Sequence, residues 1–136
     1  MPVSYRKMKF TQQNPDGANL IRRYGADFIV VGQQELHSSC IVGVSTLLPW
    51  KPRSVEELDA ESLAALFALS PEVVVLSTGI VQKFPRAALR AEFATRRIGL
   101  EVMEIGAASR TYNVLIAEER KALAAVLLPG AAQRSG

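Results

Sequence analysis

The residues that form disulfides and most metal sites are almost absent from this chain. Its 136 residues include one cysteine, Cys40, and one histidine, His37. A single cysteine cannot form an internal disulfide, so we expect a reducing compartment, the cytoplasm. Because sites built from Cys and His need several ligands, we expect no metal site, and nothing in the sequence indicates a cofactor.

Long apolar runs and a strong excess of one charge are absent as well. No stretch approaches the roughly 20 apolar residues that a membrane-spanning helix needs. No apolar run of signal-peptide length follows the positive residues Arg6, Lys7 and Lys9. The formal charge is only +3, and no basic cluster interleaved with aromatic residues accompanies it. We therefore expect neither a membrane span nor a nucleic-acid partner.

The composition that remains is typical of a globular protein, with 49% hydrophobic and 21% charged residues. We expect residues 18–129 to form a single domain, preceded by a flexible arm of residues 1–17 and followed by a frayed tail of residues 130–136. The arm ends in the turn signal Asn14-Pro15-Asp16-Gly17 and could add an edge strand through residues 9–11.

Short runs rich in β-branched residues dominate the first half of the domain. Asp27–Val31 and Leu36–Val44 are two such runs, and together they predict an antiparallel meander. Pro49 and Pro52 end the meander, because proline cannot donate to a strand ladder. Trp50 lies between them and has two open interpretations: it caps the core, or it stands exposed as a contact.

Helices and strands alternate in the second half. Ser54 and Glu57 form a capping-box pattern, and apolar spacing predicts a helix over residues 55–69 that Pro71 stops. The remaining elements follow in this order: a strand at 73–76, a helix at 86–97 packing through Leu89 and Phe93, a strand at 100–105, a third helix opened by Gly106, and a last strand at 122–127. The strand–helix–strand order sets the first two strands parallel, so the fold class is α/β.

The loops that follow these two parallel strands carry the candidate site. Parallel strands end at the same edge of a sheet, and open α/β sheets bind ligands at that edge. Backbone amides at the two helix starts could receive an anionic group there, with Lys83 or Arg110 adding charge. The candidate pocket residues are Ser77, Thr78, Gly79, Gly106, Arg110 and Asn113, and no catalytic residue is assigned.

Structural interpretations compete with this site. Neither loop carries a nucleotide-binding glycine pattern, so its glycines could serve only tight turns. Arg110 and Asn113 are three residues apart and share a helix face. With Glu118 and Arg120, they could instead form a structural network that locks the third helix to the last strand.

Two further groups of side chains have both a functional and a structural interpretation. His37 and Cys40 suggest a catalytic pair, but residues three apart in a strand face opposite sides and should not meet. Arg86, Arg90 and Arg97 project from one side of the second predicted helix. They form either a partner-binding stripe or a solvated face.

Three segments of the second half resemble a single family. They are Val73–Gly79, Gly99–Met103 and Ala108–Leu115, the last with Glu118 and Arg120. Together they resemble the Mth938-like (Mth-nine-three-eight-like) domain family, over about residues 20–129. Its members include the third assembly factor of mitochondrial NADH dehydrogenase (complex I) and an adipogenesis-associated protein. Family members often have Gly-Thr-Gly where this chain has Ser-Thr-Gly.

The resemblance implies both a fold and a function. The expected fold is a single three-layer α/β domain with a mixed central sheet, about three helices and an N-terminal antiparallel meander. The expected function is a non-enzymatic factor that binds an unidentified protein partner and aids assembly of a respiratory (NADH dehydrogenase) or membrane-associated complex. The alternative is a domain or enzyme that binds a small anion or metabolite at the carboxyl edge of the parallel strands. A concave pocket lined by Thr78, Arg110 and Asn113 would favour the alternative, and an exposed apolar patch would favour the binding factor.

Overall fold

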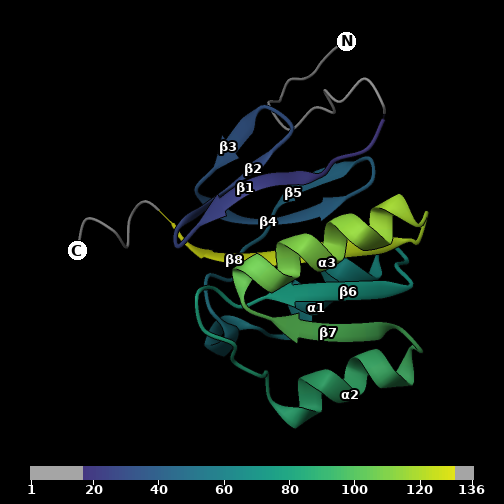
Figure 1. Cartoon of the computed structure of the whole chain (residues 1–136). Coiled ribbons are helices and arrows are strands. Elements are labelled where there is room, and N and C mark those ends of the chain that lie inside the picture. The colour runs from purple at the N-terminus through teal and green to yellow at the C-terminus, as the bar shows by residue number, and fades with distance from the viewer. Residues whose placement is uncertain (1–16, 131–136) are drawn as a thin grey trace.

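A mixed sheet of five strands forms the centre of the protein in the computed structural model, which describes residues 17–130 (Figure 1). Its strands, in the order β5-β4-β8-β6-β7, are β4 (Ser38–Gly43), β5 (Thr46–Pro49), β6 (Val73–Ser77), β7 (Gly99–Met103) and β8 (Ala122–Pro129). β6 runs parallel to β7 and β8, which confirms the predicted parallel pair, and β4 runs antiparallel to β5 and β8. The predicted arm strand at residues 9–11 and the tail residues 131–136 lie outside the described residues.

The meander forms a separate antiparallel sheet of three strands, β1 (Ile21–Gly25), β2 (Phe28–Val31) and β3 (Gln34–Leu36). The prediction of one continuous run over Leu36–Val44 is wrong. β3 pairs with β2, whereas β4 begins at Ser38 and pairs with β8 in the larger sheet. The chain changes sheets at His37. An apolar run does not reveal such a change, because the strands on both sides of it bury apolar residues.

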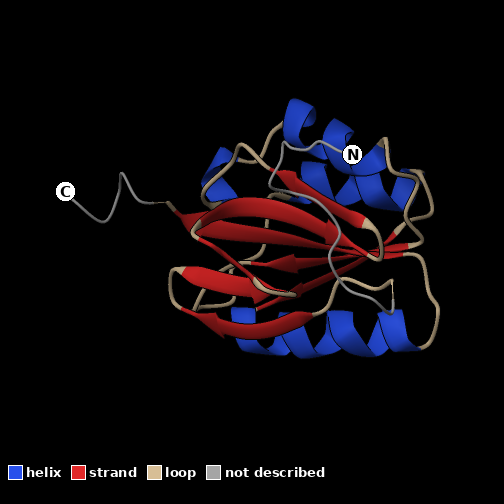
Figure 2. Cartoon of the chain, turned by 90° about the horizontal axis from the view of Figure 1, so that it is seen from above, coloured by secondary structure: helices blue, strands red, loops and turns tan. Residues whose placement is uncertain are grey.

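Helices cover both faces of the five-stranded sheet (Figure 2). α1 (Ala60–Phe67) and α2 (Ala87–Thr95) lie on one face. α3 (Ile105–Ala117) and the three-stranded sheet lie on the other. The expected α/β fold, with three layers, three α-helices and an antiparallel meander, is therefore confirmed.

β8 joins the two hydrophobic cores that these layers enclose. Leu123, Ala125 and Leu127 belong to the core under α1 and α2, and the alternate residues from Ala122 to Leu128 belong to the core under α3. Successive side chains of a strand point to opposite faces, so a strand covered on both sides must be apolar throughout. Trp50 caps the first core: it is 6% exposed, and its indole Nε1 donates to the carbonyl oxygen of Ser62 at 3.0 Å.

The predicted helix over residues 55–69 is wrong in its first turns. Residues 55–57 form a short 3-10 turn, after which the backbone becomes extended, and the Ser54 side chain makes no capping hydrogen bond. Asp59 caps α1 instead. Its carboxylate accepts from the Ser62 amide at 2.9 Å, and the Ser62 hydroxyl accepts from the Asp59 amide at 2.9 Å. Because this reciprocal pair satisfies two backbone donors, it sets the start of the helix.

β7 and α3 meet earlier than predicted. β7 ends at Met103, so the predicted strand extending to Ile105 is wrong. Ile105 is the first residue of α3, so Gly106 lies within the helix instead of opening it. Glu104 is the N-cap of α3, and its side chain accepts hydrogen bonds from amides of the first helical turn. The helix therefore begins directly after Glu104, two residues beyond the end of β7.

α2 packs on the sheet through Leu89 and Phe93, as predicted. Arg86 precedes the helix and Arg97 follows it, with a φ of 59° that takes the backbone out of helical conformation. Only Arg90 of the three arginines lies within α2, so the predicted stripe along one helix side is wrong.

Candidate functional site

The carboxyl edge of the parallel strands brings the two predicted loops together. The amide of Thr78, directly after β6, donates to the carbonyl oxygen of Met103 at 2.9 Å. The amide of Ile105, the first residue of α3, donates to the carbonyl oxygen of Gly79 at 2.7 Å. Two backbone hydrogen bonds thus hold the loop after β6 against the end of β7 and the start of α3.

The amides at the start of α3 are occupied by the chain's own carboxylate. Gly106 N donates to Glu104 Oε1 at 2.8 Å, and Ala107 N donates to Glu104 Oε2 at 2.7 Å. These two hydrogen bonds, with a smaller contribution from Arg110, hold the pKa of Glu104 below its ordinary value. Glu104 therefore fills the position in which the sequence predicted an external anion, and a ligand there would have to displace it.

Arg110 lies at this edge, where its guanidinium Nη1 donates to the hydroxyl of Tyr24 at 3.3 Å on the surface. The Tyr24 hydroxyl approaches Gly106 so closely that a Cβ atom on Gly106 would lie 2.9 Å from it. A side chain at Gly106 would therefore displace the Tyr24 hydroxyl from its present position. No sequence pattern indicated Tyr24, which comes from β1, 82 residues before Gly106 in the chain.

Asn113 does not join this group. Its side-chain amide pairs with the backbone of Ile21 in β1, at 2.9 Å for each of two hydrogen bonds. Arg120 is separate again, because its Nε donates to Glu72 at 3.0 Å. Among the described residues, Arg110, Asn113 and Arg120 thus have three different partners, and the predicted single network that joins them is not formed.

Neither Ser77 nor Thr78 offers its hydroxyl to a ligand: Ser77 is buried, and the Thr78 hydroxyl is hydrogen-bonded within the loop. Ser77 is 1% exposed, and its hydroxyl has no hydrogen-bond partner within the described part of the chain. The Thr78 hydroxyl donates to the carbonyl oxygen of Val81 at 2.7 Å and accepts from the Lys83 amide at 3.1 Å. Gly79 adopts a φ of 98°, which disfavours any residue with a side chain. Of the six candidate residues, only Arg110 presents an exposed side-chain donor, and anion binding here stays a prediction.

The same loop displays three large apolar side chains that the sequence analysis did not single out. Ile80, Val81 and Phe84 are 69%, 60% and 62% exposed. Two apolar residues after Gly79, followed by a phenylalanine next to Pro85, were the available signal, but a segment without helical or strand periodicity does not indicate which way its side chains face. We call Ile80, Val81 and Phe84, with the backbone of residues 79–85, the apolar loop.

Chemistry at the other candidate residues is limited by burial. Cys40 is a free thiol at 1% exposure, and burial raises the pKa of the Cys40 thiol to about 12. His37 instead contacts Glu35, with Nε2 and Oε2 at 2.9 Å.

Within residues 17–130, no group of three or more His, Cys, Asp or Glu side chains could hold a metal ion. None of the helices in this range combines the length and the apolar character that a membrane crossing needs.

Comparison with known proteins identifies the class to which this fold belongs. Residues 21–127 match the family described as Protein of unknown function (DUF498/DUF598), and the chain belongs to that family. A solved structure from Bordetella pertussis, described as a Mth938-like domain, shares the fold with a TM-score of 0.73 at 23% identity, covering 90% of this chain and 94% of that one. The expected family is thereby confirmed.

Particular relatives carry a functional name. The chain is 30% identical over 134 residues to a Danio rerio protein named NADH dehydrogenase [ubiquinone] 1 alpha subcomplex assembly factor 3, covering 96% of this chain and 77% of that protein. A Xenopus tropicalis protein of the same name is 24% identical, with 92% and 70% covered. Among solved structures, one from Xanthomonas campestris is 36% identical with a TM-score of 0.78, covering 88% of this chain and 92% of that one.

Proposed function

We propose that this protein is a non-enzymatic binding factor that aids assembly of a respiratory NADH dehydrogenase or another membrane-associated complex. The relatives named as assembly factors support this proposal, because they align with nearly the whole chain. The apolar loop is the observation that carries it, because three exposed apolar side chains on one loop are costly to keep in water unless a partner covers them. We also propose the cytoplasm as its compartment, which the free, buried thiol of Cys40 supports.

The apolar loop is fixed in shape before any partner arrives. The Thr78 hydroxyl bridges two positions of its backbone, as described above. Gln82 Nε2 donates to the carbonyl oxygen of Val102 at 2.9 Å, and Lys83 Nζ pairs with Glu56 Oε2 at 2.8 Å. Hydrogen bonds thus anchor the loop to β7 and to the turn before α1. A loop already ordered in the free protein loses less conformational entropy on binding, which favours affinity for a protein surface.

The charge beside the loop suggests what its partner presents. Residues 83–97 carry five positive side chains and one negative one, Glu92. Arg86 and Arg90 are exposed and follow the apolar loop directly in the chain. The complementary partner surface is an apolar patch bordered by acidic residues, since complementary charge steers association and selects among partners.

Complementation of a deletion in the organism that encodes this chain tests the proposal. The deletion should reduce the amount of assembled NADH dehydrogenase on native gels, and the wild-type chain should restore it. We expect the double variant Ile80→Asp with Phe84→Asp to fail, because two charges would have to be buried in the interface. Val114→Asp, at a 54% exposed apolar residue on α3, is the matched control and should restore assembly.

Two outcomes would contradict the proposal. Normal levels of the complex after deletion would exclude the assembly role. Full restoration by the folded double variant, with thermal unfolding like that of the wild type, would exclude the apolar loop as the docking surface. Loss of function in Val114→Asp as well would show that the result reflects added charge in general, which also removes support for the loop.

A further inference from the structure

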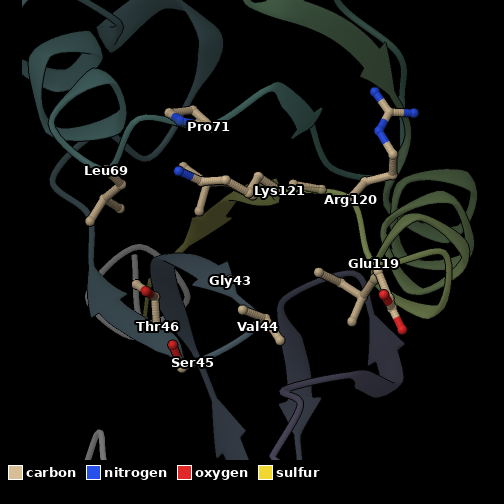
Figure 3. Close-up of a pocket in the computed structure, with 12 residues that line it drawn as sticks. Gly43, Val44, Ser45, Thr46, Leu69, Pro71, Glu119, Arg120 and Lys121 are labelled. Carbon is tan, nitrogen blue, oxygen red and sulfur yellow. The ribbon is translucent and has the colours of Figure 1, made fainter.

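A cavity of about 430 Å³ opens at the opposite edge of the sheet, where the parallel strands begin (Figure 3). Three connections line it: the β4–β5 turn, the link from α1 to β6, and the link from α3 to β8. This volume is within the range of small-molecule sites, about 300–1,000 Å³. The cavity is separate from the apolar loop, which follows the other end of β6, and nothing described so far gives it a role.

The wall formed by the β4–β5 turn is held rigidly by Asn19. The Asn19 side-chain nitrogen donates to the carbonyl oxygens of Gly43 at 3.2 Å and Thr46 at 3.0 Å. The Asn19 backbone amide donates to the carbonyl oxygen of Val44 at 2.9 Å. Asn19 is itself held by Tyr112, whose hydroxyl donates to its carbonyl oxygen at 2.7 Å. Burial raises the pKa of Tyr112, so this hydroxyl keeps its proton. The turn is therefore ordered without a ligand.

The opposite wall, the link from α3 to β8, is held by Glu72. Its Oε1 accepts from Arg120 Nε at 3.0 Å and from the backbone amide of Lys121 at 3.1 Å. The backbone amide of Glu72 donates to the carbonyl oxygen of Lys121 at 2.8 Å. Arg120 lines the cavity, but its guanidinium is paired with Glu72, and Figure 3 shows its side chain pointing away from the cavity.

Lys121 is the cation that remains for a ligand. Within residues 17–130, no carboxylate lies within ion-pair distance of its ammonium group. Figure 3 shows its side chain running along the cavity wall toward Leu69. Ser45 and Thr46 bring hydroxyl groups to the wall on the other side. Glu119 and Arg120 also line the cavity. The other side chains of the lining are apolar: Val44, Leu69, Pro71, Ile116, Ala122 and Leu123.

We propose that this cavity binds an amphiphilic carboxylate, a single carboxylate group attached to an apolar chain. The carboxylate pairs with the Lys121 ammonium and accepts from the hydroxyls of Ser45 and Thr46, while the apolar chain covers Leu69 and Ile116. A carboxylate fits better than a phosphate. Phosphate monoesters carry about −1.5 to −2 charges at pH 7, whereas Lys121 is the one cation of the lining without an ion-pair partner among residues 17–130, and Glu119 adds a negative charge to the lining. The chemistry is common to free carboxylic acids and to the C-terminus of a peptide that ends in an apolar residue.

Titration followed by amide NMR of the full chain tests the site. We expect octanoate to shift the amide signals of residues 43–46 and 119–123, and acetate and 1-octanol to shift them much less, since each lacks one half of the required chemistry. Lys121→Met keeps the apolar stem and removes the charge. It should weaken octanoate binding by about tenfold or more, the effect of losing a charge-assisted hydrogen bond. Lys51→Met, at an exposed lysine outside the cavity, is the matched control and should bind as the wild type does.

The same titration can overturn the proposal. Equal shifts from octanoate and 1-octanol would show that the carboxylate is not recognised. Octanoate shifts confined to other residues would exclude the cavity as the binding site. An equal loss in Lys51→Met would show unspecific charge attraction. A peptide ending in leucine, compared with its C-terminal amide, separates the two sources: preferential binding of the acid form assigns the site to peptide termini, and binding of octanoate alone assigns it to free acids.

Discussion

The side-chain amide of Asn113 and the backbone of Ile21 form a closed pair of hydrogen bonds between residues 92 positions apart in the chain. Ile21 N donates to Asn113 Oδ1, and Asn113 Nδ2 donates to Ile21 O, each at 2.9 Å. Asn113 thereby acts toward β1 as a neighbouring strand would, and it joins the three-stranded sheet to α3. Primary amides are suited to this role because they carry both a donor and an acceptor.

Asn113→Ala should lower the free energy of unfolding by about 1–3 kcal/mol, because both backbone groups of Ile21 lose their partner in a partly buried site. Urea denaturation measures the change. Val114→Ala, at the exposed neighbouring residue, is the control and should remain within about 0.5 kcal/mol of the wild type. Equal stability of Asn113→Ala and the control would contradict the role assigned to the pair.

Asp59→Ala should lower the denaturation midpoint clearly, because α1 would lose the acceptor that caps its first turn. Asp59→Asn should retain most of the stability, since asparagine also caps helices well. Ser54→Ala should leave the midpoint unchanged, because the Ser54 side chain makes no cap. The reverse order of effects would restore the capping box that the sequence indicated.

Glu104 should make stability depend on pH in one direction. Its folded pKa lies below the ordinary 4.5, first because of the Gly106 amide and then the Ala107 amide. The stabilisation is therefore fully present above the unfolded pKa and is lost as the pH falls through the folded pKa. The melting temperature of Glu104→Gln should lie below that of the wild type at pH 7, and the difference should shrink below pH 4.5. A constant difference across this range would show that the charge of Glu104 is irrelevant.

Arg110→Ala separates the two interpretations of the carboxyl edge. Its exposed contact with Tyr24 at 3.3 Å contributes little, so stability should change by no more than about 0.5 kcal/mol. Because Glu104 already fills the anion position, added phosphate should raise the melting temperature of neither the wild type nor the variant. Stabilisation of the wild type by phosphate, lost in Arg110→Ala, would instead support the predicted anion site.

Ser77→Ala should be neutral or should raise the free energy of unfolding by up to about 1 kcal/mol. A buried hydroxyl without a partner costs desolvation, and alanine removes that cost with little loss of volume. The midpoint of chemical denaturation measures the effect. A clear loss of stability would show that the Ser77 hydroxyl has a partner, such as a buried water molecule.

Periodicity in the sequence was sufficient for the layers of the fold and insufficient for their boundaries. The apolar run at residues 122–127 predicted the last strand, which the structure places at Ala122–Pro129 with both faces covered. The residue at which α1 begins was harder to predict. Ser54 and Asp59 are both good capping residues followed by acidic or polar partners, and only the packed position of the chain decides between them.

The candidate site was predictable only where it depends on strand order. Parallel strands place their following loops together whatever the side chains are. The loop after β6 therefore meets the start of α3 as expected, through the hydrogen bond from the Ile105 amide to Gly79. The partners of Asn113 and Arg110 come from β1, and the sequence contains no signal for which residues of a separate sheet will lie against a helix. Local patterns likewise could not show that the carboxylate of Glu104, one residue before the helix, would accept the hydrogen bonds of the amides that were predicted to bind an anion.

The position of β8 has a consequence for the order in which the protein can fold. β8 is the last of the described elements, yet it lies in the middle of the sheet between β4 and β6. As the chain leaves the ribosome, β4 with β5 and β6 with β7 can form only as two separate halves, each with an unsatisfied inner edge. The final nine residues of the described chain supply the strand that closes both edges at once. Completion of the core is therefore postponed until residues 122–129 have been synthesised, and a nascent chain stalled before residue 122 exposes two strand edges to aggregation.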